Sequence, residues 1–309
     1  MTDIKYSMGT RKHIPVLIVL VLLASCNLRH PDVVEVDFTG DRQEEVQVVP
    51  ESGPVLRVAI APVISPRESY AYYQELFEYM GLHLDMKIEY KQRASYEEVN
   101  EMLERNLVDL AFICTGAYIE GSAGMDLLVG PQFDGVPLYQ AVVVVSAQSD
   151  IQTFADFRGR NFAYTDPLSF TGRLYPDSRI RALGEDPETF FGSVQFTYGH
   201  DVSMQMVARN LIDGASVNGL IYRYVQSSHP EITNNLRIIE RSDSFGVPPI
   251  VTSLLLPPET SDRIRSLFLE MHLDPNGRSI LDHLIIERFV ALGDSMYNTA
   301  REIRTQAWQ

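Results

Sequence analysis

The fold is decided by a strand followed by a helix, at residues 55–60 (VLRVAI) and 65–80 (SPRESYAYYQELFEYM). The first run is short and apolar, which is typical of a buried strand. Ser65 and Glu68 have the spacing of a capping box, with proline at the first helical position. Aromatic and apolar residues then recur at helical spacing until Gly81, which ends the helix.

The same alternation of strand and helix continues along the chain. Residues 84–90 alternate as a strand does, residues 95–98 (SYEE) form a second capping box, and residues 110–114 form a buried strand. Strands that alternate with helices predict an α/β fold with a parallel sheet.

A weak internal repeat indicates two similar α/β lobes. Residues 105–111 read RNLVDLA, and residues 209–215 read RNLIDGA. Each copy has the pattern of a helix end, a turn and an apolar strand, and a glycine-bearing loop follows. The alternative interpretation is coincidence between two ordinary helix-to-strand turns.

Two apolar strands are expected to pass between the lobes, at residues 141–145 and 250–256. Two crossings make the first lobe discontinuous, with boundaries at 55–142 plus 251–309. The second lobe is then residues 143–250. In such sheets, ligands bind beyond the carboxyl ends of the strands, and closure of the lobes traps the ligand.

Composition excludes several classes of protein. The chain has 309 residues, of which 45% are hydrophobic and 22% charged, with a formal net charge of −15. This length fits one large or two ordinary globular domains. The acidic balance argues against nucleic-acid binding, because no basic stripe could follow a phosphate backbone. Two cysteines form neither a disulfide framework nor a four-thiolate metal site.

Motifs of catalysis are absent from the sequence. The seven histidines are scattered without a metal-ligand pair, and there is no nucleophile elbow, phosphate-binding loop or dinucleotide fingerprint. The chain is therefore predicted not to be an enzyme and to hold no cofactor or metal. We interpret Cys114 as a core cysteine, since nothing marks it as a nucleophile.

The N-terminus has the pattern of a targeting segment. Basic residues at 11–13 precede an apolar run at 14–23, which is shorter than the roughly 20 residues of a membrane-spanning helix. The run ends in Leu-Ala-Ser before Cys26, which resembles a bacterial lipobox. The alternative is a buried helix that ends in cysteine.

The targeting pattern predicts a lipoprotein signal peptide at residues 1–25 and lipidation of Cys26, which would anchor the protein to a membrane outside the cytoplasm. Residues 26–54 are polar and acidic and are expected to be a flexible tether. Residues 33–38 alternate in polarity, so an additional edge strand there is the alternative.

The most informative polar segment is residues 163–173 (AYTDPLSFTGR). A strand is expected to end at Thr165, and a helix begins near 169–171. Hydroxyls and free N–H groups at a helix start can bind an anion, and Gly172 permits close approach to the backbone. The alternative is that the hydroxyls only cap the helix.

A second such segment is residues 199–201 (GHD), which follows a strand and begins another helix. Asp201 is a plausible N-cap. The alternative interpretation of His200 is a surface or capping histidine.

These motifs together resemble those of phosphate, phosphite and phosphonate substrate-binding proteins of ABC transporters. The segments at 61–66, 166–172, 199–201, 210–217 and 274–294 follow one another in the order and spacing of that family. The resemblance implies a two-lobed periplasmic-binding-protein fold of type II, with two hinge strands, and an ABC permease as partner. It also implies an oxyanion held between the lobes of a monomer by neutral donors.

The resemblance implies a set of ligand-binding residues from both lobes. These are Ser65, Thr115, Tyr118, Ser169, Phe170, Thr171, Gly172, His200 and Asn218.

Two of these positions depart from the family pattern. The family commonly has Ser-Thr-Ser-Gly where this chain has serine, Phe170, threonine and glycine, so one hydroxyl is replaced by an apolar ring. Many members have aspartate where this chain has Asn218, which can donate a hydrogen bond. The departures indicate a different oxyanion, a larger organic phosphonate or lost binding.

The sequence therefore predicts a lipid-anchored solute-binding protein that captures a phosphorus oxyanion for an ABC importer. The alternative is a sensory or structural lipoprotein of the same fold that works with a membrane receptor.

Overall fold

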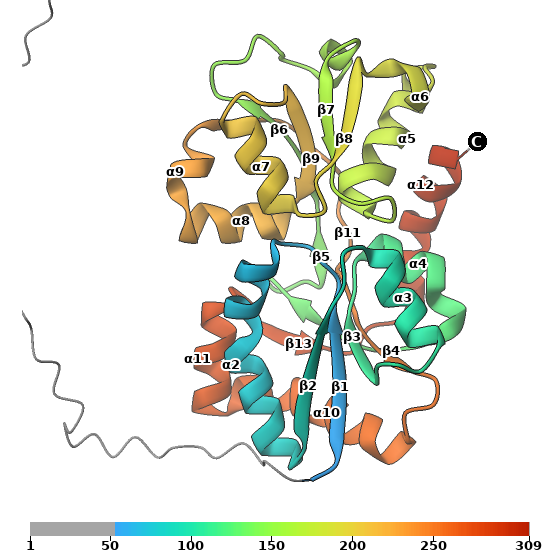
Figure 1. Ribbon diagram of the computed structural model, residues 1–309, viewed down its shortest axis with the longest axis vertical. Helices are drawn as coiled ribbons and strands as arrows, with labels where there is room; N and C mark the ends of the chain where they lie inside the picture. Colours follow the sequence, from blue (N-terminus) through green and yellow to red (C-terminus); the bar gives the residue numbers. More distant parts are fainter. Residues whose placement is uncertain (1–52, 309) are drawn as a thin grey trace, which may run out of the picture. The chain divides into compact units, whose positions relative to one another are not determined.

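The computed structural model describes residues 53–308, which belong to one compact unit. The predicted signal peptide, Cys26, residues 33–38 and nearly all of the tether lie outside the described residues. Two sheets, each flanked by helices, form two lobes (Figure 1). Among residues 53–308, no helix is both long and apolar enough to span a membrane.

The first sheet has the strand order β13-β4-β12-β3-β1-β2. Its strands are β1 (Val55–Ile60), β2 (Lys87–Gln92), β3 (Leu110–Phe112), β4 (Met125–Gln132), β12 (Ile250–Ser253) and β13 (Arg288–Val290). β1 pairs in parallel with β2 and β3, as the sequence predicts. The expectation of a parallel sheet holds for this half only, because β12 pairs antiparallel with β3 and β4. The chain enters β12 on its return from the second lobe and therefore runs opposite to β3.

The second sheet has the strand order β10-β6-β9-β7-β8. Its strands are β6 (Ala141–Ser146), β7 (Asn161–Tyr164), β8 (Ser193–Phe196), β9 (Gly214–Asn218) and β10 (Leu236–Arg241). β7 pairs in parallel with β8 and β9, and β6 pairs antiparallel with β9 and β10. Both sheets are therefore mixed, with a parallel part that presents its carboxyl ends toward the other lobe (Figure 1).

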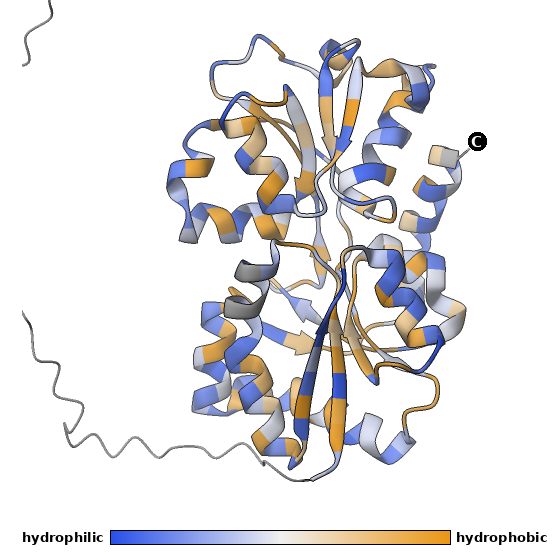
Figure 2. Ribbon diagram, viewed as in Figure 1, coloured by the Kyte–Doolittle hydropathy of each residue, from blue (hydrophilic) through white to orange (hydrophobic). Residues whose placement is uncertain are grey.

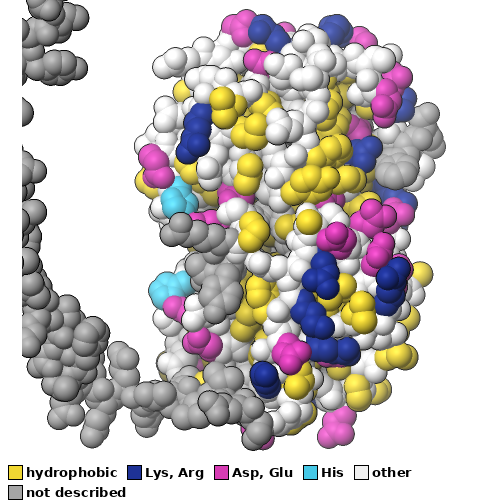
Figure 3. Space-filling model, in the orientation of Figure 1, with side chains coloured by type: hydrophobic (Ala, Val, Ile, Leu, Met, Phe, Trp, Pro, Cys, Tyr) yellow, Lys and Arg dark blue, Asp and Glu magenta, His cyan; other side chains and the backbone are white. Residues whose placement is uncertain are grey.

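Helices cover both sheets. They are α2 (Pro66–Leu84), α3 (Tyr96–Glu104), α4 (Thr115–Gly121), α5 (Tyr175–Ala182), α6 (Pro187–Phe190), α7 (His200–Ala208), α8 (Gly219–Ser228), α9 (Pro230–Thr233), α10 (Pro258–Glu270), α11 (Pro275–His283) and α12 (Asn298–Trp308). Leu56, Val58 and Ile60 of β1 pack on the side of α2, α10 and α11, and Ala59 packs on the opposite face. This period of two is what a strand buried on both faces requires. Hydrophobic residues concentrate in the strands, and basic and acidic side chains are interspersed on the visible surface (Figures 2 and 3).

Two short strands connect the lobes. β5 (Leu138–Tyr139) pairs antiparallel with β11 (Phe245–Gly246), and both lie between the two sheets in Figure 1. The predicted crossings at 141–145 and 250–256 are both wrong by one element, because β6 is already part of the second sheet and β12 is already part of the first. The crossings lie at β5 and β11, which precede them. The valine run of β6 has the pattern of a buried strand, and this pattern does not show which sheet the strand joins.

The internal repeat is confirmed by matching geometry. Asn106 and Asn210 both adopt a left-handed conformation after a helix, with φ of 55° and 56°. Asp109 and Asp213 then accept a backbone N–H at 2.8 Å from the neighbouring strand. The repeat is therefore one αβ turn used twice, once in each lobe.

The C-terminal helix α12 contacts both lobes. In the second lobe it packs against α5 and against the turn that precedes α5 (Phe170–Leu174). In the first lobe it packs against α4. Arg304 of α12 forms an ion pair with Glu120 of α4. The last helix therefore ties the two lobes together at the side of the hinge.

Candidate ligand-binding site

The loop after β7 carries the most informative polar segment, and much of its polarity is used internally. The loop leads into a single π-helical turn (Phe170–Leu174) that opens α5. Ser169 Oγ accepts the Gly172 N–H at 3.0 Å, so this serine caps the helix. A Cβ on Gly172 would lie 2.4 Å from Thr165 Oγ1, so glycine is required there by internal packing. Ser169 and Gly172 thus shape the loop.

The next two side chains of this turn are buried. The ring of Phe170 is fully buried and meets the edge of Phe245, with ring centroids 4.7 Å apart. The Thr171 backbone carbonyl accepts a hydrogen bond from Ser216 Oγ. Thr171 Oγ1 is buried and has no hydrogen-bond partner among the described residues.

His200 lies at the start of α7 and is fully buried, so the alternative of a surface histidine is wrong. Its Nδ1 accepts the Asn218 backbone N–H at 3.2 Å and lies 3.0 Å from Thr165 Oγ1. Burial lowers the pKa of His200 to about 3, so the ring is neutral at pH 7. Because Nδ1 accepts, the proton of the neutral ring is on Nε2. That donor is buried and has no hydrogen-bond partner in residues 53–308.

Two tyrosines that the sequence analysis did not single out face the same region. Tyr96, at the first position of α3, and Tyr139, in the hinge strand β5, are buried, and their hydroxyls have no hydrogen-bond partner in the described part of the chain. Burial raises the pKa of both phenols well above the usual value, so both stay protonated. Cys114 lies near both phenols and adds to the rise of their pKa, which Ser169 partly offsets at Tyr96 and Thr115 at Tyr139. Tyr96 therefore lies against the loop after β7, and Tyr139 lies against residues 114–115.

We call Tyr96, Tyr139, Thr171 and His200 the donor cluster. Each contributes a buried polar atom without a partner among residues 53–308. Three members border the loop after β7, because Tyr96 neighbours Ser169, Gly172 beside Thr171 packs on Thr165, and Thr165 contacts His200. Tyr139 joins them through Cys114, which lies near both tyrosines. A buried polar group without a partner costs free energy, so unpaired donors mark a place where a ligand can bind. All four groups are uncharged at pH 7.

Three predicted first-lobe residues use their polar groups within the protein. Thr115 Oγ1 donates to Gly246 O at 3.0 Å, and Tyr118 Oη donates to Asp294 Oδ1 at 2.8 Å. The Ser65 backbone N–H donates to Asp201 Oδ1 at 2.9 Å. Their roles in ligand binding stay predictions.

Carboxylates of the second lobe occupy two helix starts of the first lobe. Asp201 accepts the Ser65 N–H before α2, and Asp166 Oδ2 accepts the Tyr96 N–H of α3 at 3.1 Å. Both are buried, and burial raises the pKa of each carboxyl. Helix starts are favourable places for anions. One backbone donor at each of these helix starts is therefore taken by a carboxylate of the protein.

Cys114 is a buried core cysteine, as predicted. Burial raises the pKa of its thiol to about 11, although backbone N–H groups of Phe170 and Gly116 point at the sulfur. The lobes meet closely here, since a Cβ on Gly116 would lie 2.0 Å from Leu168 O. The thiol therefore stays protonated at the contact between the lobes.

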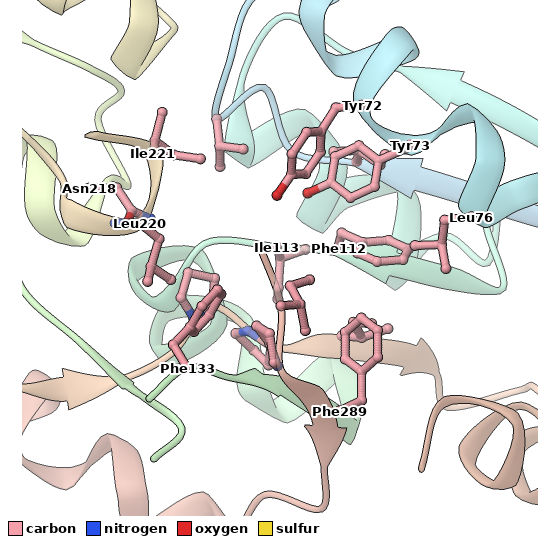
Figure 4. A pocket seen from close by; sticks show the side chains of 17 residues that line it. Tyr72, Tyr73, Leu76, Phe112, Ile113, Phe133, Asn218, Leu220, Ile221 and Phe289 are labelled. Atoms are coloured by element: carbon pink, nitrogen blue, oxygen red, sulfur yellow. The ribbon is translucent and has the colours of Figure 1, made fainter. Parts of the chain in front are cut away.

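A cavity of about 90 Å³ lies beside the donor cluster, between the lobes. We call it the cleft cavity. Its lining comes from the ends of β1 and β3, from α2, from β12 and β13, and from Asn218 and the start of α8 (Figure 4). Asn218 joins the two regions, because its backbone N–H binds His200 and its side chain faces the cavity.

A model of the family described as "ABC transporter, phosphonate, periplasmic substrate-binding protein" matches residues 58–297. The chain belongs to this family. Its members are solute-binding transport proteins of the periplasm, not enzymes. The family places the protein outside the cytoplasm, as the sequence predicts.

Two relatives are about a quarter identical to this family member over the aligned residues. The phosphate-import protein PhnD of Mycolicibacterium smegmatis is 25% identical over 237 residues, which cover 72% of this chain and 73% of the relative. The phosphonates-binding periplasmic protein of Escherichia coli is 26% identical over 174 residues, or 55% of this chain and 51% of the relative.

Solved structures show the same two-lobed, type II fold. A binding protein of an ABC phosphonate transporter from Pseudomonas aeruginosa superposes with a TM-score of 0.78 at 20% identity, covering 83% of this chain and 87% of that one. PhnD1 of Prochlorococcus marinus, in complex with methylphosphonate, gives a TM-score of 0.74 at 17% identity, covering 82% and 97%. The predicted fold is confirmed.

Proposed function

We propose that this protein captures a phosphorus oxyanion between its lobes and delivers it to an ABC permease. The observation that carries the proposal is the donor cluster. A phosphoryl group offers several acceptor oxygens, and the cluster offers hydroxyl and imidazole donors without partners in the described chain. Fixed neutral donors can hold an anion inside an acidic protein.

The choice of phosphorus rests on the family and its relatives. One relative is named for phosphate import, another for binding phosphonates, and a protein of the same fold holds methylphosphonate. Phosphate, phosphite and phosphonates share the tetrahedral oxyanion head that the donor cluster would hold. Phe170 stands where the family commonly has a hydroxyl and packs against Phe245, so this turn offers one hydroxyl fewer to such a head.

The proposal includes a lipid anchor on Cys26 after removal of residues 1–25, with residues 26–54 as the tether. It divides the folded part into a first lobe of residues 55–142 plus 251–309 and a second lobe of residues 143–250. The membership of the strands in the two sheets supports this division, except that the first residues of β6 and of β12 belong to the lobe that each strand enters. Mass spectrometry of the membrane-extracted protein tests the anchor. An acylated Cys26 is expected, and an unmodified Cys26 would contradict it.

A thermal-shift screen of the full chain in mild detergent tests the ligand class. The compounds are phosphate, phosphite, methylphosphonate, sulfate and acetate. A ligand at a hundredfold excess over its dissociation constant stabilises the folded state by about 2.7 kcal/mol. We expect a shift from a phosphorus compound and none from sulfate or acetate. The reverse selectivity would refute the proposed ligand class.

The same screen on Thr171→Val tests the site. Loss of one hydrogen bond to a charged ligand costs about 1.5–3 kcal/mol, or roughly ten- to a hundredfold in affinity. Thr197→Val is a matched control, because Thr197 Oγ1 has partners in Gly199 O and Ser203 Oγ. Equal affinity in Thr171→Val and the wild type would remove Thr171 from the site.

A further inference from the structure

We propose that the ligand carries a compact, uncharged alkyl group of about three to four carbons, which the cleft cavity holds. The inference rests on the proposed function, since it concerns the substituent of the oxyanion that the donor cluster binds. It starts from the chemistry of the cavity lining. All lining residues in the described part of the chain are uncharged, and most are aliphatic, aromatic or proline.

Both lobes supply apolar walls. Leu220 and Ile221 of α8 face the cavity from the second lobe, opposite Tyr72 and Tyr73 of α2 (Figure 4). Phe112 at the end of β3 extends the aromatic wall, with its ring centroid 5.2 Å from that of Tyr73. An apolar group placed here contacts both lobes, so its burial favours the closed form.

The polar groups of the cavity are few and uncharged. The Tyr72 hydroxyl already donates to Leu284 O at 2.7 Å. Asn218 Oδ1 accepts the Leu220 N–H at 2.8 Å. No carboxylate among the described residues lines the cavity, so an ammonium group there would have no anionic partner.

The cavity lies next to the donor cluster, where the organic substituent of a bound oxyanion would extend. The side chain of Asn218 lines the cavity. The backbone N–H of the same residue donates to His200 Nδ1 in the donor cluster. An oxyanion on the donor cluster can therefore extend its organic part past Asn218 into the cavity.

The cavity volume limits the size of the substituent. A cavity of about 150 Å³ accommodates benzene, which has six carbons. The cleft cavity measures about 90 Å³. In proportion, it holds about three to four carbons.

The test is titration calorimetry of the full chain with methyl-, ethyl-, propyl-, butyl- and hexylphosphonate. Each buried methylene should tighten binding about fourfold. We expect affinity to rise to propyl- or butylphosphonate and to fall at hexylphosphonate. A matched pair isolates the charge: propylphosphonate and 2-aminoethylphosphonate have equally many non-hydrogen atoms, but only the second ends in an ammonium group. We expect propylphosphonate to bind at least tenfold more tightly.

A variant whose larger side chain fills part of the cavity provides a second test. Leu220→Phe adds bulk to the cavity wall, and Leu211→Phe is the control, because Leu211 is exposed at the far turn of the second lobe. We expect Leu220→Phe to lower the ratio of the propylphosphonate to the methylphosphonate affinity. Leu211→Phe should leave this ratio as in the wild type.

The outcomes separate this inference from the proposed function. If methylphosphonate binds but chain length has no effect, or 2-aminoethylphosphonate binds more tightly than propylphosphonate, the inference is overturned and the proposed function stands. If propane-1-sulfonate and its homologues show the chain-length trend and no phosphonate binds, the cavity inference stands and the proposed ligand class fails. If no compound binds, both are overturned.

Discussion

Removing the Tyr96 hydroxyl should stabilise the ligand-free protein and weaken ligand binding. Tyr96 is fully buried, and its Oη has no hydrogen-bond partner in residues 53–308. A buried, unpaired polar group costs about 1–3 kcal/mol. We expect Tyr96→Phe to raise the free energy of unfolding by about 1 kcal/mol, at the low end because Ser169 lies near the phenol.

The effect on affinity has the opposite sign. If Tyr96 donates to the oxyanion, its loss costs about 1.5–3 kcal/mol of binding free energy, or roughly ten- to a hundredfold. Urea denaturation without ligand measures the first effect, and calorimetry with methylphosphonate measures the second. A residue with only a structural role would not move the two quantities in opposite directions.

Tyr175→Phe is the matched control. Tyr175 is also buried, but its Oη donates to Glu240 Oε1 at 2.6 Å. Its removal should lower the free energy of unfolding by about 1.5–3 kcal/mol, as for other hydrogen bonds to charged groups, and leave the affinity unchanged. If Tyr96→Phe lowers stability as Tyr175→Phe does, the assignment of Tyr96 as an unpaired donor is refuted.

Three further predictions concern residues around the donor cluster. The pKa of His200 is about 3 in the folded state and about 6.5 when unfolded, so its contribution to stability is present above pH 6.5 and is lost as pH falls. Between pH 7.5 and 5 the wild type should lose about 2 kcal/mol more than His200→Gln in urea denaturation; equal losses would refute the buried neutral ring. Gly172→Ala should lower the free energy of unfolding by about 1–3 kcal/mol, because its Cβ would lie 2.4 Å from Thr165 Oγ1; unchanged stability would show that the loop adapts. Cys114 should react with a thiol reagent only under denaturing conditions, since it is buried and its pKa is about 11; rapid labelling at pH 7.5 would show that the lobes open there.

The sequence predicts the architecture because local patterns report it. Helix caps, apolar periodicity and the αβ repeat act over a few residues: Ser95 accepts the Glu98 N–H at the start of α3, and Asn106 and Asn210 show that the repeat is geometrically real. The capping box predicted at Ser65 is wrong, because its side chain makes no cap hydrogen bond at the start of α2. The direction of β12 is not a local property. It depends on which lobe the chain returns from, so the antiparallel half of the first sheet was not predictable from periodicity.

The candidate site was predictable only in part. The loop after β7 and the start of α7 are visible as polar segments, and the structure brings Gly172, Thr165 and His200 together. Tyr96 and Tyr139 were missed because their aromatic side chains fit an ordinary core pattern. A tyrosine directly after a capping serine, at the start of a helix that follows a parallel strand, is the signal that could have identified Tyr96.

The partners of Ser65, Thr115 and Tyr118 could not be predicted either. Asp201, Gly246 and Asp294 lie more than 100 residues away along the chain. Such contacts depend on the tertiary fold, and the one between Ser65 and Asp201 depends also on the closure of the two lobes.

Titration calorimetry of the full chain with methylphosphonate and methanesulfonate tests the central claim most directly. The two ligands differ mainly in the central atom and the protonation of the head group. The account predicts saturable binding of one methylphosphonate per chain, at least tenfold tighter than methanesulfonate, and weakened at least tenfold in Thr171→Val. Binding of methanesulfonate in preference, or methylphosphonate binding that Thr171→Val leaves unchanged, would contradict it.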